Sequence, residues 1–381
     1  MSLNPHGGKL INRRIRNEER NSILKSINDH YSIEIDFEKV VELQNIAFGV
    51  YSPLEGFMTS DDYNEVVNNS KLKNGVDWTL PIVLDVSKDV VKNFAKGDDI
   101  LLKNEGKPVA LLNVEDIYSW DREKYANNVY QTLDKNHPGV NKLFNMQDLL
   151  VGGKIKFLSD KITKYPEYFL VPEELREKFK QMGWKSIVGF QTRNVPHLGH
   201  EYVQKTALSI VDGLLINPVI GKKKPGDFKD GVILDSYNAL MENYYVKNHT
   251  MLAILQTEMR YAGPKEAVFH AIVRKNLGCT HFIIGRDHAG VGNYYDPFAA
   301  QKIFDKFPDL EIQPVFFMSF FFCKKCNAIA NDKICPHGDE DHINFAGKII
   351  RKKLSDGEIP PETMMRKEVS QTILKYDNPF V

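Results

Sequence analysis

The sequence has no long apolar run, no excess of charge of either sign and few cysteines. Hydrophobic residues make up 42 % of the 381 residues and charged residues 26 %, a composition typical of globular proteins. Because no apolar run could span a bilayer, we expect no membrane partner. Fifty basic residues balance fifty acidic residues, so no overall field attracts a nucleic-acid backbone, and we expect no nucleic-acid partner.

Targeting signals, internal repeats and low-complexity segments are also missing. The first residues lack the basic segment and apolar core of a secretory signal, so we expect a cytoplasmic protein. With a typical domain of about 150 residues, the length of the chain predicts two or three domains.

The short apolar runs predict two different folding patterns. Up to about residue 150, β-like runs at 80–86, 100–102 and 108–114 alternate with turn-forming residues, which predicts a mostly β domain. From about residue 180, strands alternate with helical periodicity, which predicts a Rossmann-like α/β domain with a parallel sheet and helices on both faces. The expected elements there are strands at 186–190, 213–220, 251–256, 281–285 and 312–318, and helices at 233–245, 264–277, 297–307 and from residue 197 onward.

A third, small part follows the α/β pattern. It contains a cysteine-rich loop and two predicted helices, at 347–354 and 361–375. The expected domains are an N-terminal domain over 1–155, a catalytic α/β domain over 156–319 and a small C-terminal domain over 320–381.

The segment Gly-Phe-Gln-Thr-Arg-Asn-Val-Pro-His-Leu-Gly-His at 189–200 ends a predicted strand and begins a predicted helix. Positions i and i+3 share a helix face, so His197 and His200 would lie side by side at a helix N-terminus, where anions are favoured. The alternative to an anion site is that both histidines lie on the surface or that one of them only caps the helix. The glutamine, arginine and asparagine just before them favour a ligand site, because open α/β sheets bind ligands at the ends of their strands.

Two further loops follow predicted strands of the same sheet. Gly-Arg-Asp-His-Ala-Gly-Val-Gly at 285–292 has three glycines that let the backbone approach a ligand, and Arg286 and His288 offer charge to phosphate. A flexible connection without a ligand is the alternative reading. Arg260 is either a cation that supports the site or an ordinary surface arginine.

A cluster of thiols and imidazoles follows the α/β domain. Its Cys-x-x-Cys pair, with a later cysteine and histidine, fits the ligand spacing of a tetrahedral structural zinc site. A redox dithiol and a disulfide are the alternatives, and a cytoplasm disfavours the disulfide. The candidate ligands are Cys323, Cys326, Cys335 and His337, with His342 and then Asp339 as alternatives for the fourth position.

Several of these segments together resemble ATP sulfurylase (sulfate adenylyltransferase), of the zinc-containing microbial type without a kinase domain. They are the segments 191–200, Met-Arg-Tyr-Ala-Gly-Pro at 259–264, 285–290, Pro-His-Gly-Gly-Lys-Leu at 5–10 and Tyr-Ser-Pro-Leu-Glu-Gly-Phe-Met at 51–58. The resemblance implies a PUA-like N-terminal β domain, a nucleotidyltransferase α/β domain and a small C-terminal domain. No G-x-x-x-x-G-K-[S/T] loop follows, so no fused adenylylsulfate kinase is expected.

The resemblance also implies roles for individual residues. Sulfate would contact Gln191, Arg193 and the backbone N–H of Ala289. The expected ATP-binding residues are Gln191, Thr192, Asn194, His197, His200, Gly285, Arg286, Asp287, His288 and Ser319. The expected catalytic residues are Thr192, Arg193, Asn194, His197 and His200. Mg²⁺ would accompany ATP without a protein ligand, and the cysteine cluster would hold a structural Zn²⁺.

The implied reaction is reversible adenylyl transfer from ATP to sulfate, in a homodimer or larger homo-oligomer. Another H-x-G-H nucleotidyltransferase with an organic phosphate acceptor is the first alternative, and an RNA-binding module is the second. Two departures from the family pattern stand out: Val195 replaces a proline, and Phe-Ala-Gly-Lys at 345–348 replaces a Ser-Gly-Thr stretch, which removes two hydroxyls.

Overall fold

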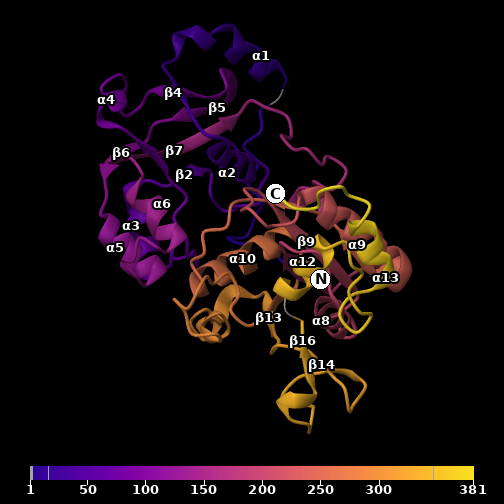
Figure 1. Cartoon of the computed structure of the whole chain (residues 1–381). Coiled ribbons are helices and arrows are strands. Elements are labelled where there is room, and N and C mark those ends of the chain that lie inside the picture. The colour runs from indigo at the N-terminus through magenta and orange to yellow at the C-terminus, as the bar shows by residue number, and fades with distance from the viewer. Residues whose placement is uncertain (1–2, 16, 346) are drawn as a thin grey trace.

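The computed structural model describes residues 3–15, 17–345 and 347–381. Figure 1 shows an N-terminal body in indigo and magenta, a second body in pink, orange and yellow, and a small hairpin that projects from the second body. The departure from the family pattern at Ala346 lies outside the described residues.

The N-terminal body is built around one sheet, with the order β1-β4-β5-β7-β2, and with β3 and β6 also paired to β7. Its described strands are β1 Ser32–Glu34, β2 Gly56–Phe57, β3 Leu84–Val86, β4 Asp99–Asn104, β5 Lys107–Asn113, β6 Asp116–Ser119 and β7 Leu149–Phe157. Strand β7 is the centre of this sheet. A side chain at Gly152 would overlap the backbone carbonyl of Met58, and one at Gly153 would overlap that of Asn113. Glycine at these two positions therefore lets the neighbouring backbone segments pack closely against β7.

Helices also cover this sheet, although the sequence predicts a mostly β domain. The described helices are α1 Asn17–Lys25, α2 Phe37–Ala47, α3 Ser60–Asn69, α4 Lys88–Val91, α5 Arg122–Tyr125 and α6 Pro138–Phe144. Helix α2 is buried at every position from Val40 to Ala47. A helix buried on all sides has no polar face, so it lacks the periodic signal by which a helix is recognised in a sequence.

The second body contains the predicted parallel sheet, with the order β10-β9-β8-β12-β13, and with β11 also paired to β9. Every one of these described pairings is parallel. The strands are β8 Ile187–Thr192, β9 Gly213–Ile220, β10 Thr250–Leu252, β11 Leu255–Gln256, β12 His281–Ile284 and β13 Gln313–Phe316. The helices are α7 Pro172–Gln181, α8 Leu198–Leu208, α9 Asp230–Tyr244, α10 Pro264–Leu277 and α11 Ala299–Lys302. The single strand predicted at 251–256 is therefore two short strands, β10 and β11.

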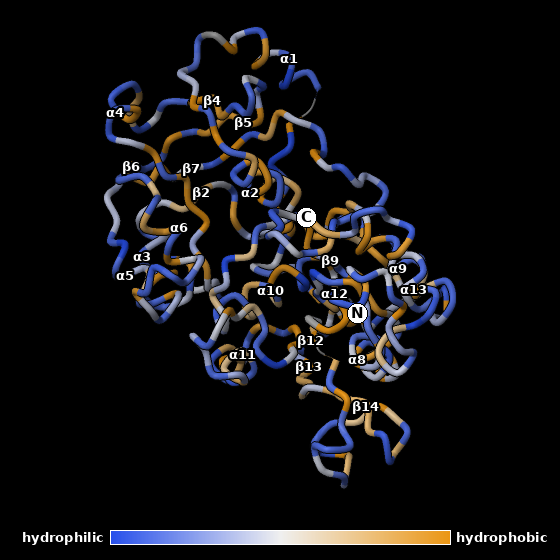
Figure 2. The backbone as a smooth tube through the Cα atoms, viewed as in Figure 1, coloured by the Kyte–Doolittle hydropathy of each residue, from blue (hydrophilic) through white to orange (hydrophobic). Residues whose placement is uncertain are grey.

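Alternate residues of this sheet enter two separate cores, which confirms that helices cover both of its faces. Ile187 and Leu215 join the core that contains α10, whereas Val188 and Leu214 join the core that contains α8 and α9. Figure 2 shows apolar stretches on the strands of both bodies and polar residues in the connecting loops. Because side chains alternate along a strand, one run of β-branched and leucine residues supplies both cores.

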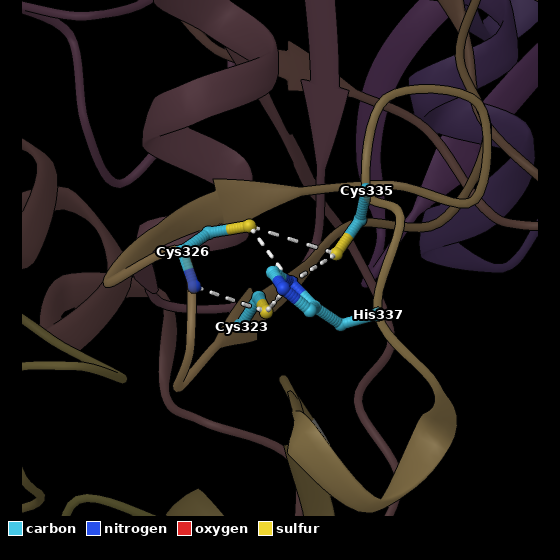
Figure 3. A group of neighbouring side chains, drawn as sticks. All are labelled: Cys323, Cys326, Cys335 and His337. Atoms are coloured by element: carbon cyan, nitrogen blue, oxygen red, sulfur yellow. Dashed lines mark hydrogen bonds between the residues drawn. The ribbon is translucent and has the colours of Figure 1, made fainter.

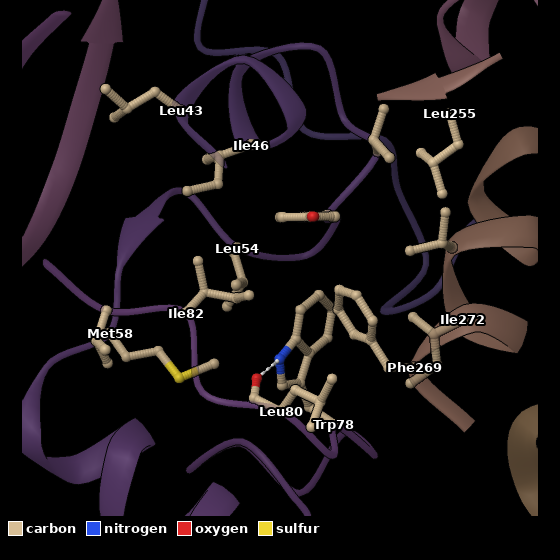
Figure 4. Close-up of a cluster of buried hydrophobic side chains, with 14 of the residues drawn as sticks. Leu43, Ile46, Leu54, Met58, Trp78, Leu80, Ile82, Leu255, Phe269 and Ile272 are labelled. Atoms are coloured by element: carbon tan, nitrogen blue, oxygen red, sulfur yellow. Dashed lines mark hydrogen bonds between the residues drawn. The ribbon is translucent and has the colours of Figure 1, made fainter. Parts of the chain in front are cut away.

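The core on the α10 side continues into the N-terminal body. Phe269 of α10 packs edge-on against Trp78 and Tyr51 of the N-terminal body, with ring centroids 5.5 Å and 5.3 Å apart. Figure 4 shows these aromatic and aliphatic side chains meeting from the two bodies. The Tyr51 hydroxyl also lies 2.8 Å from the Thr257 hydroxyl. A shared apolar core of this kind makes the two bodies one packing unit.

The C-terminal part returns to the second body. It comprises β14 Phe321–Cys323, β15 Ala328–Ala330 and β16 His342–Asn344, which form a small antiparallel sheet, followed by α12 Gly347–Ser355 and α13 Lys367–Ile373. The helix predicted at 361–375 begins only at Lys367, because a turn closed by Pro361 occupies the preceding residues. Among the described residues, no helix is both long and apolar enough to cross a membrane.

A buried ion pair also joins the two bodies. The Arg260 Nη2 atom lies 2.6 Å from the Glu42 Oε1 atom, and Lys39 lies 2.9 Å from the other carboxylate oxygen. Burial alone would raise the pKa of Glu42, but Lys39 and Arg260 lower it below its ordinary value. Arg260 is therefore a buried cation of the interface and not a surface arginine.

We expect Glu42→Ala to destabilise the protein strongly, because it leaves Arg260 buried without its carboxylate. Breaking a buried pair from one side costs about 3–5 kcal/mol, so the melting temperature should fall by several degrees. Glu173→Ala is the matched control, since that carboxylate is 75 % exposed in its pair with Arg14 and such pairs contribute about 0–1 kcal/mol. Equal shifts for the two variants in thermal unfolding would contradict this account.

Candidate active site

The turn between β8 and α8 brings the two predicted histidines together. His197 is the N-cap of α8, and its Nδ1 atom accepts a hydrogen bond from the His200 backbone N–H at 3.3 Å. The two rings stack with their centroids 3.7 Å apart and their planes at 18°. Phe345, which follows β16, also stacks on His197, with ring centroids 5.4 Å apart. The side-by-side placement predicted from the i, i+3 spacing is thus present.

Burial decides the charge of these histidines. It lowers the pKa of His200 to about 4 and that of His197 well below its ordinary value, with His200 adding to the effect on His197. Both rings are therefore neutral near pH 7. Each can donate an N–H to an anion, but neither brings a positive charge at that pH.

Gln191, at the end of β8, is held from behind by two more histidines, the buried His270 and the half-buried His288. The Gln191 Nε2 atom donates to His270 Nδ1 at 3.0 Å. The His288 Nε2 atom lies 3.1 Å from His270 Nδ1. Because an amide nitrogen can only donate, His270 Nδ1 accepts and the ring proton is on Nε2, which lies 3.5 Å from Glu266 Oε1. Gln191 Oε1 is buried without a hydrogen-bond partner.

His288 does not supply the positive charge that the sequence analysis expects of it. Burial, followed by the nearby Arg274, lowers the pKa of His288 to about 3. Its ring packs edge-on against Phe282 and lies beside His270. His288 is therefore neutral and faces the interior, where it supports the Gln191 network.

Arg193 is restrained by three contacts. One terminal nitrogen donates to the Tyr261 hydroxyl at 3.0 Å, and the other donates to the Lys222 carbonyl at 3.1 Å and lies 3.5 Å from an Asp227 oxygen. The Arg193 side chain is 18 % exposed. A guanidinium held in place but open to solvent can form bidentate hydrogen bonds with an oxyanion.

The loops around Arg193 carry strained backbone. Tyr261, Asp287 and Ala289 have φ values of +59°, +53° and +57°, a region that non-glycine residues seldom adopt. The Gly263 N–H donates to the Ala289 carbonyl at 3.0 Å, which ties the two loops together. A side chain at Gly290 would overlap the Asp287 carboxylate. Such strain concentrates at functional sites because the surrounding packing maintains it.

The remaining predicted residues lie around this centre. The Thr192 hydroxyl and the Asn194 backbone bond to each other at 3.1 Å. Arg286 and Ser319 are exposed, at the ends of β12 and β13, and Gly285 is half-buried beside Arg286. Since β8, β12 and β13 are parallel neighbours, their carboxyl ends share one edge of the sheet.

Three residues that support the site, and one that reaches it from outside, were not predicted from the sequence. Glu266 and His270 lie within the apolar pattern of a helix, where nothing indicates contact with Gln191, and Tyr261 was seen only as part of a motif. The fourth is Arg351 of α12, whose Nη2 atom donates to Asn194 Oδ1 at 2.8 Å. Contacts between residues so far apart in the chain leave no trace in local spacing.

The cysteine cluster in the projecting hairpin is a candidate metal site. The ligand atoms of Cys323, Cys326, Cys335 and His337 all lie within 4.8 Å of one another, and Figure 3 shows them converging. His337 Nδ1 lies 3.4, 3.2 and 3.8 Å from the three sulfurs, and the sulfurs of Cys326 and Cys335 are 3.8 Å apart. In a tetrahedron with ordinary zinc bond lengths the edges are about 3.6 Å for N–S and about 3.8 Å for S–S. The cluster could therefore hold a tetrahedral metal ion.

His342 lies next to this group. Its Nε2 atom is 3.6 Å from the Cys335 sulfur, and its ring stacks on Phe321 with centroids 3.5 Å apart. It therefore remains the alternative ligand to His337. All four cysteines are free thiols, so the disulfide alternative is absent from the structure.

Comparison with known proteins follows the same division of the chain. A PUA-like domain model matches residues 3–160, and the ATP-sulfurylase model matches residues 166–376. A curated sulfate adenylyltransferase of Pyrococcus abyssi is 51 % identical and covers 100 % of both chains. A relative of the same name from Aeropyrum pernix is 47 % identical, and the match covers 100 % of both chains. Another from Halothermothrix orenii is 42 % identical, and the match covers 98 % of this chain and 99 % of that one.

A solved structure described as a hexameric APS kinase from Thiobacillus denitrificans has a TM-score of 0.78 at 21 % identity. The match covers 99 % of this chain and 69 % of that chain, and at this identity it shows the fold alone. The predicted PUA-like and α/β domains are confirmed. A family model over more than half of the chain, with relatives near 50 % identity along its whole length, shows that the chain belongs to the ATP-sulfurylase family.

Proposed function

We propose that this protein transfers the adenylyl group of ATP to sulfate, giving adenosine 5′-phosphosulfate and pyrophosphate. The observation that carries the proposal is the end of β8, where a restrained but open guanidinium, Arg193, lies on the same turn as two stacked neutral imidazoles. An oxyanion can be held there beside N–H donors at a helix N-terminus, which suit a phosphate chain. Full-length relatives that carry the name sulfate adenylyltransferase support the same reaction.

The reaction needs positioning more than acid–base chemistry. A sulfate oxygen attacks the α-phosphorus, the new S–O–P bond forms, and the bond to the bridging oxygen of the β-phosphate breaks as pyrophosphate leaves with the electron pair. Sulfate is already a dianion at neutral pH, so no general base is required. The difficulty is electrostatic, because two like unit charges 4 Å apart repel by about 4 kcal/mol at an effective dielectric of 20.

Sulfate is assigned to Arg193, Gln191 and the backbone N–H of Ala289. Tyr261 fixes the Arg193 side chain, and His270 fixes the amide of Gln191. The positive φ of Ala289 sets the direction of its peptide groups in a loop already tied to Gly263. A tetrahedral anion held by donors from the end of β8 and from the loop after β12 can be oriented for in-line attack.

ATP is assigned to the opposite side of the same turn. Thr192, Asn194, His197 and His200 would contact the phosphates, and Gly285–Asp287 and Ser319 would hold the rest of the nucleotide at the ends of β12 and β13. As neutral donors, the two imidazoles would stabilise charge that develops on the α- and β-phosphates. Mg²⁺ would arrive with the nucleotide, bound mainly by phosphate and water.

Two alternative functions have less support. A nucleotidyltransferase with an organic phosphate acceptor would share the paired histidines, but relatives that match along the whole chain bear the sulfate adenylyltransferase name. An RNA-binding role for the PUA-like domain would need a basic surface, and the net charge of the chain is zero.

The decisive assay is pyrophosphate release from ATP, with pyrophosphatase present to draw the reaction forward. We expect release only when sulfate is added. Release without sulfate, or no release with it, would contradict the proposed reaction.

The oligomeric state, the location and the domain boundaries are also proposals. We propose a homodimer or larger homo-oligomer, and a cytoplasmic location, where free thiols persist. We also propose three domains, at 1–155, 156–319 and 320–381; strand β7 ends at Phe157, next to the first boundary.

Arg193→Ala should abolish adenylylsulfate formation while ATP binding survives, because the charge of Arg193 is assigned to sulfate. Losing a charged hydrogen-bond partner costs about 1.5–3 kcal/mol, so affinity for a sulfate analogue should fall at least about tenfold. Calorimetric titrations with ATP and with the analogue measure the two effects separately. Unchanged analogue binding in the variant would overturn the assignment.

His197→Ala and His200→Ala should lower kcat more than they raise KM for ATP, because their N–H groups are assigned to transition-state charge. Because the pKa of His200 is lowered to about 4, its ring stays neutral from pH 8 down through the pH range in which an ordinary histidine becomes protonated. Activity should therefore show no loss from this group until the pH falls toward 4–5. The control is His249→Ala, which alters an exposed ring far from this turn. A higher KM for ATP with unchanged kcat in either active-site variant would contradict the proposed role in stabilising the transition state.

We propose that the metal of the cysteine cluster is one structural Zn²⁺. Four protein ligands leave no open position for substrate, so zinc would stabilise the hairpin without joining the chemistry. Cys335→Ser should lose zinc in elemental analysis, whereas Cys279→Ala, which changes a thiol outside the cluster, should keep about one ion per chain. Chelation should lower the melting temperature before it lowers activity; the reverse order would indicate a catalytic metal.

A further inference from the structure

Helix α12 places a guanidinium on the active-site turn. Arg351 Nη2 donates to Asn194 Oδ1 at 2.8 Å, although the two residues are 157 positions apart. The Nε atom of Arg351 is buried and has no hydrogen-bond partner. A buried donor of a charged group that lacks a partner costs free energy, so its retention calls for a ligand or a neighbour that repays the cost.

Arg351 has no carboxylate partner among the described residues, unlike other cations of the C-terminal part. Lys353, on the same helix, lies 2.9 Å from Glu358, and Arg366 forms a bidentate pair with Glu201 at 2.9 Å. Within the described part of the chain, no carboxylate lies within ion-pair distance of Arg351. Its positive charge is therefore available to an anion.

The start of α12 is packed against the start of α8. Phe345, two residues before α12, stacks on His197, and a side chain at Gly199 would come within 2.6 Å of the Phe345 ring. This packing places the helix at the turn to which the phosphates are assigned. Arg351 thus reaches the nucleotide side of the turn, while Arg193 is held by Tyr261 on the sulfate side.

We propose that Arg351 is a nucleotide-binding residue, which orients the Asn194 amide and supplies positive charge to the triphosphate of ATP. The proposal rests on the proposed function, because it assigns Asn194 to the phosphates. With Oδ1 of Asn194 engaged by Arg351, the amide nitrogen is the end left to donate to a phosphate oxygen.

The electrostatics of the turn support this role. Burial lowers the pKa values of His197 and His200, so both rings are neutral and bring no charge toward the polyanion. Arg193 is assigned to sulfate and already has Asp227 nearby at 3.5 Å. A guanidinium presents five N–H donors in a planar fork, so Arg351 can keep its bond to Asn194 and still contact a phosphate. The C-terminal part of the chain then completes the nucleotide site.

Arg351→Gln should weaken ATP binding by about 10- to 100-fold in calorimetry, as expected for a lost charge-assisted hydrogen bond, with unchanged affinity for a sulfate analogue. Lys353→Gln is the matched control on the same helix, and it should bind ATP as the unmodified protein does. Arg351→Lys should recover part of the lost affinity, because it restores the charge without the fork. Wild-type ATP affinity in a folded Arg351→Gln protein would overturn the proposal.

A second measurement does not depend on the folding of that variant. The ¹⁵N side-chain resonance of Arg351, identified by its absence in Arg351→Lys, should shift when ATP is added and stay in place when sulfate alone is added. No shift with saturating ATP would refute the contact. Both measurements use ATP binding without turnover, so a protein that binds ATP through Arg351 but forms no adenylylsulfate would refute the proposed reaction and leave this inference standing.

Discussion

One buried side chain, Glu266, holds in place both the loop that contacts Arg193 and the histidine that contacts Gln191. Its two carboxylate oxygens accept the backbone N–H groups of Arg260 and Ala262, each at 2.9 Å, and it also faces His270. The first two bonds fix the loop that presents Tyr261 to Arg193, and His270 in turn receives the amide of Gln191. Glu266 is fully buried, so a substitution would leave these donors without water or partner.

The balance of charge around the site follows from which groups are buried. Four histidines surround the turn and the loop at 285–290, and burial lowers the pKa of every one of them. The neutral imidazoles bring no positive charge, so the cations at this turn are guanidiniums, Arg193 within it and Arg351, which bonds to Asn194. If Arg193 binds sulfate and Arg351 binds the nucleotide, as proposed, each of the two anions has its own cation and their mutual repulsion is reduced.

The parallel sheet was predictable because its strands and helices have clear periods, and α10 begins and ends at the predicted residues. The helices of the N-terminal body were not, because α2 is buried on nearly every side and short elements such as α5 carry little signal. The helix predicted at 297–307 is an α-helix only over Ala299–Lys302 and continues as a tighter 3₁₀ turn. Packing against neighbours decides such details more than local propensity does.

The sequence alone determined two groups of side chains that lie together: the paired histidines with the amide and guanidinium before them, and three thiols with a histidine. Short spacing at a helix start leaves little geometric freedom for the two histidines, and the ligand spacing typical of structural zinc sites marks the thiol cluster. Only the tertiary structure decided that His270 supports Gln191, that Arg351 reaches Asn194 and that the histidines are neutral. Those contacts join residues 79 and 157 positions apart, and the protonation state depends on burial, which no local stretch of sequence specifies.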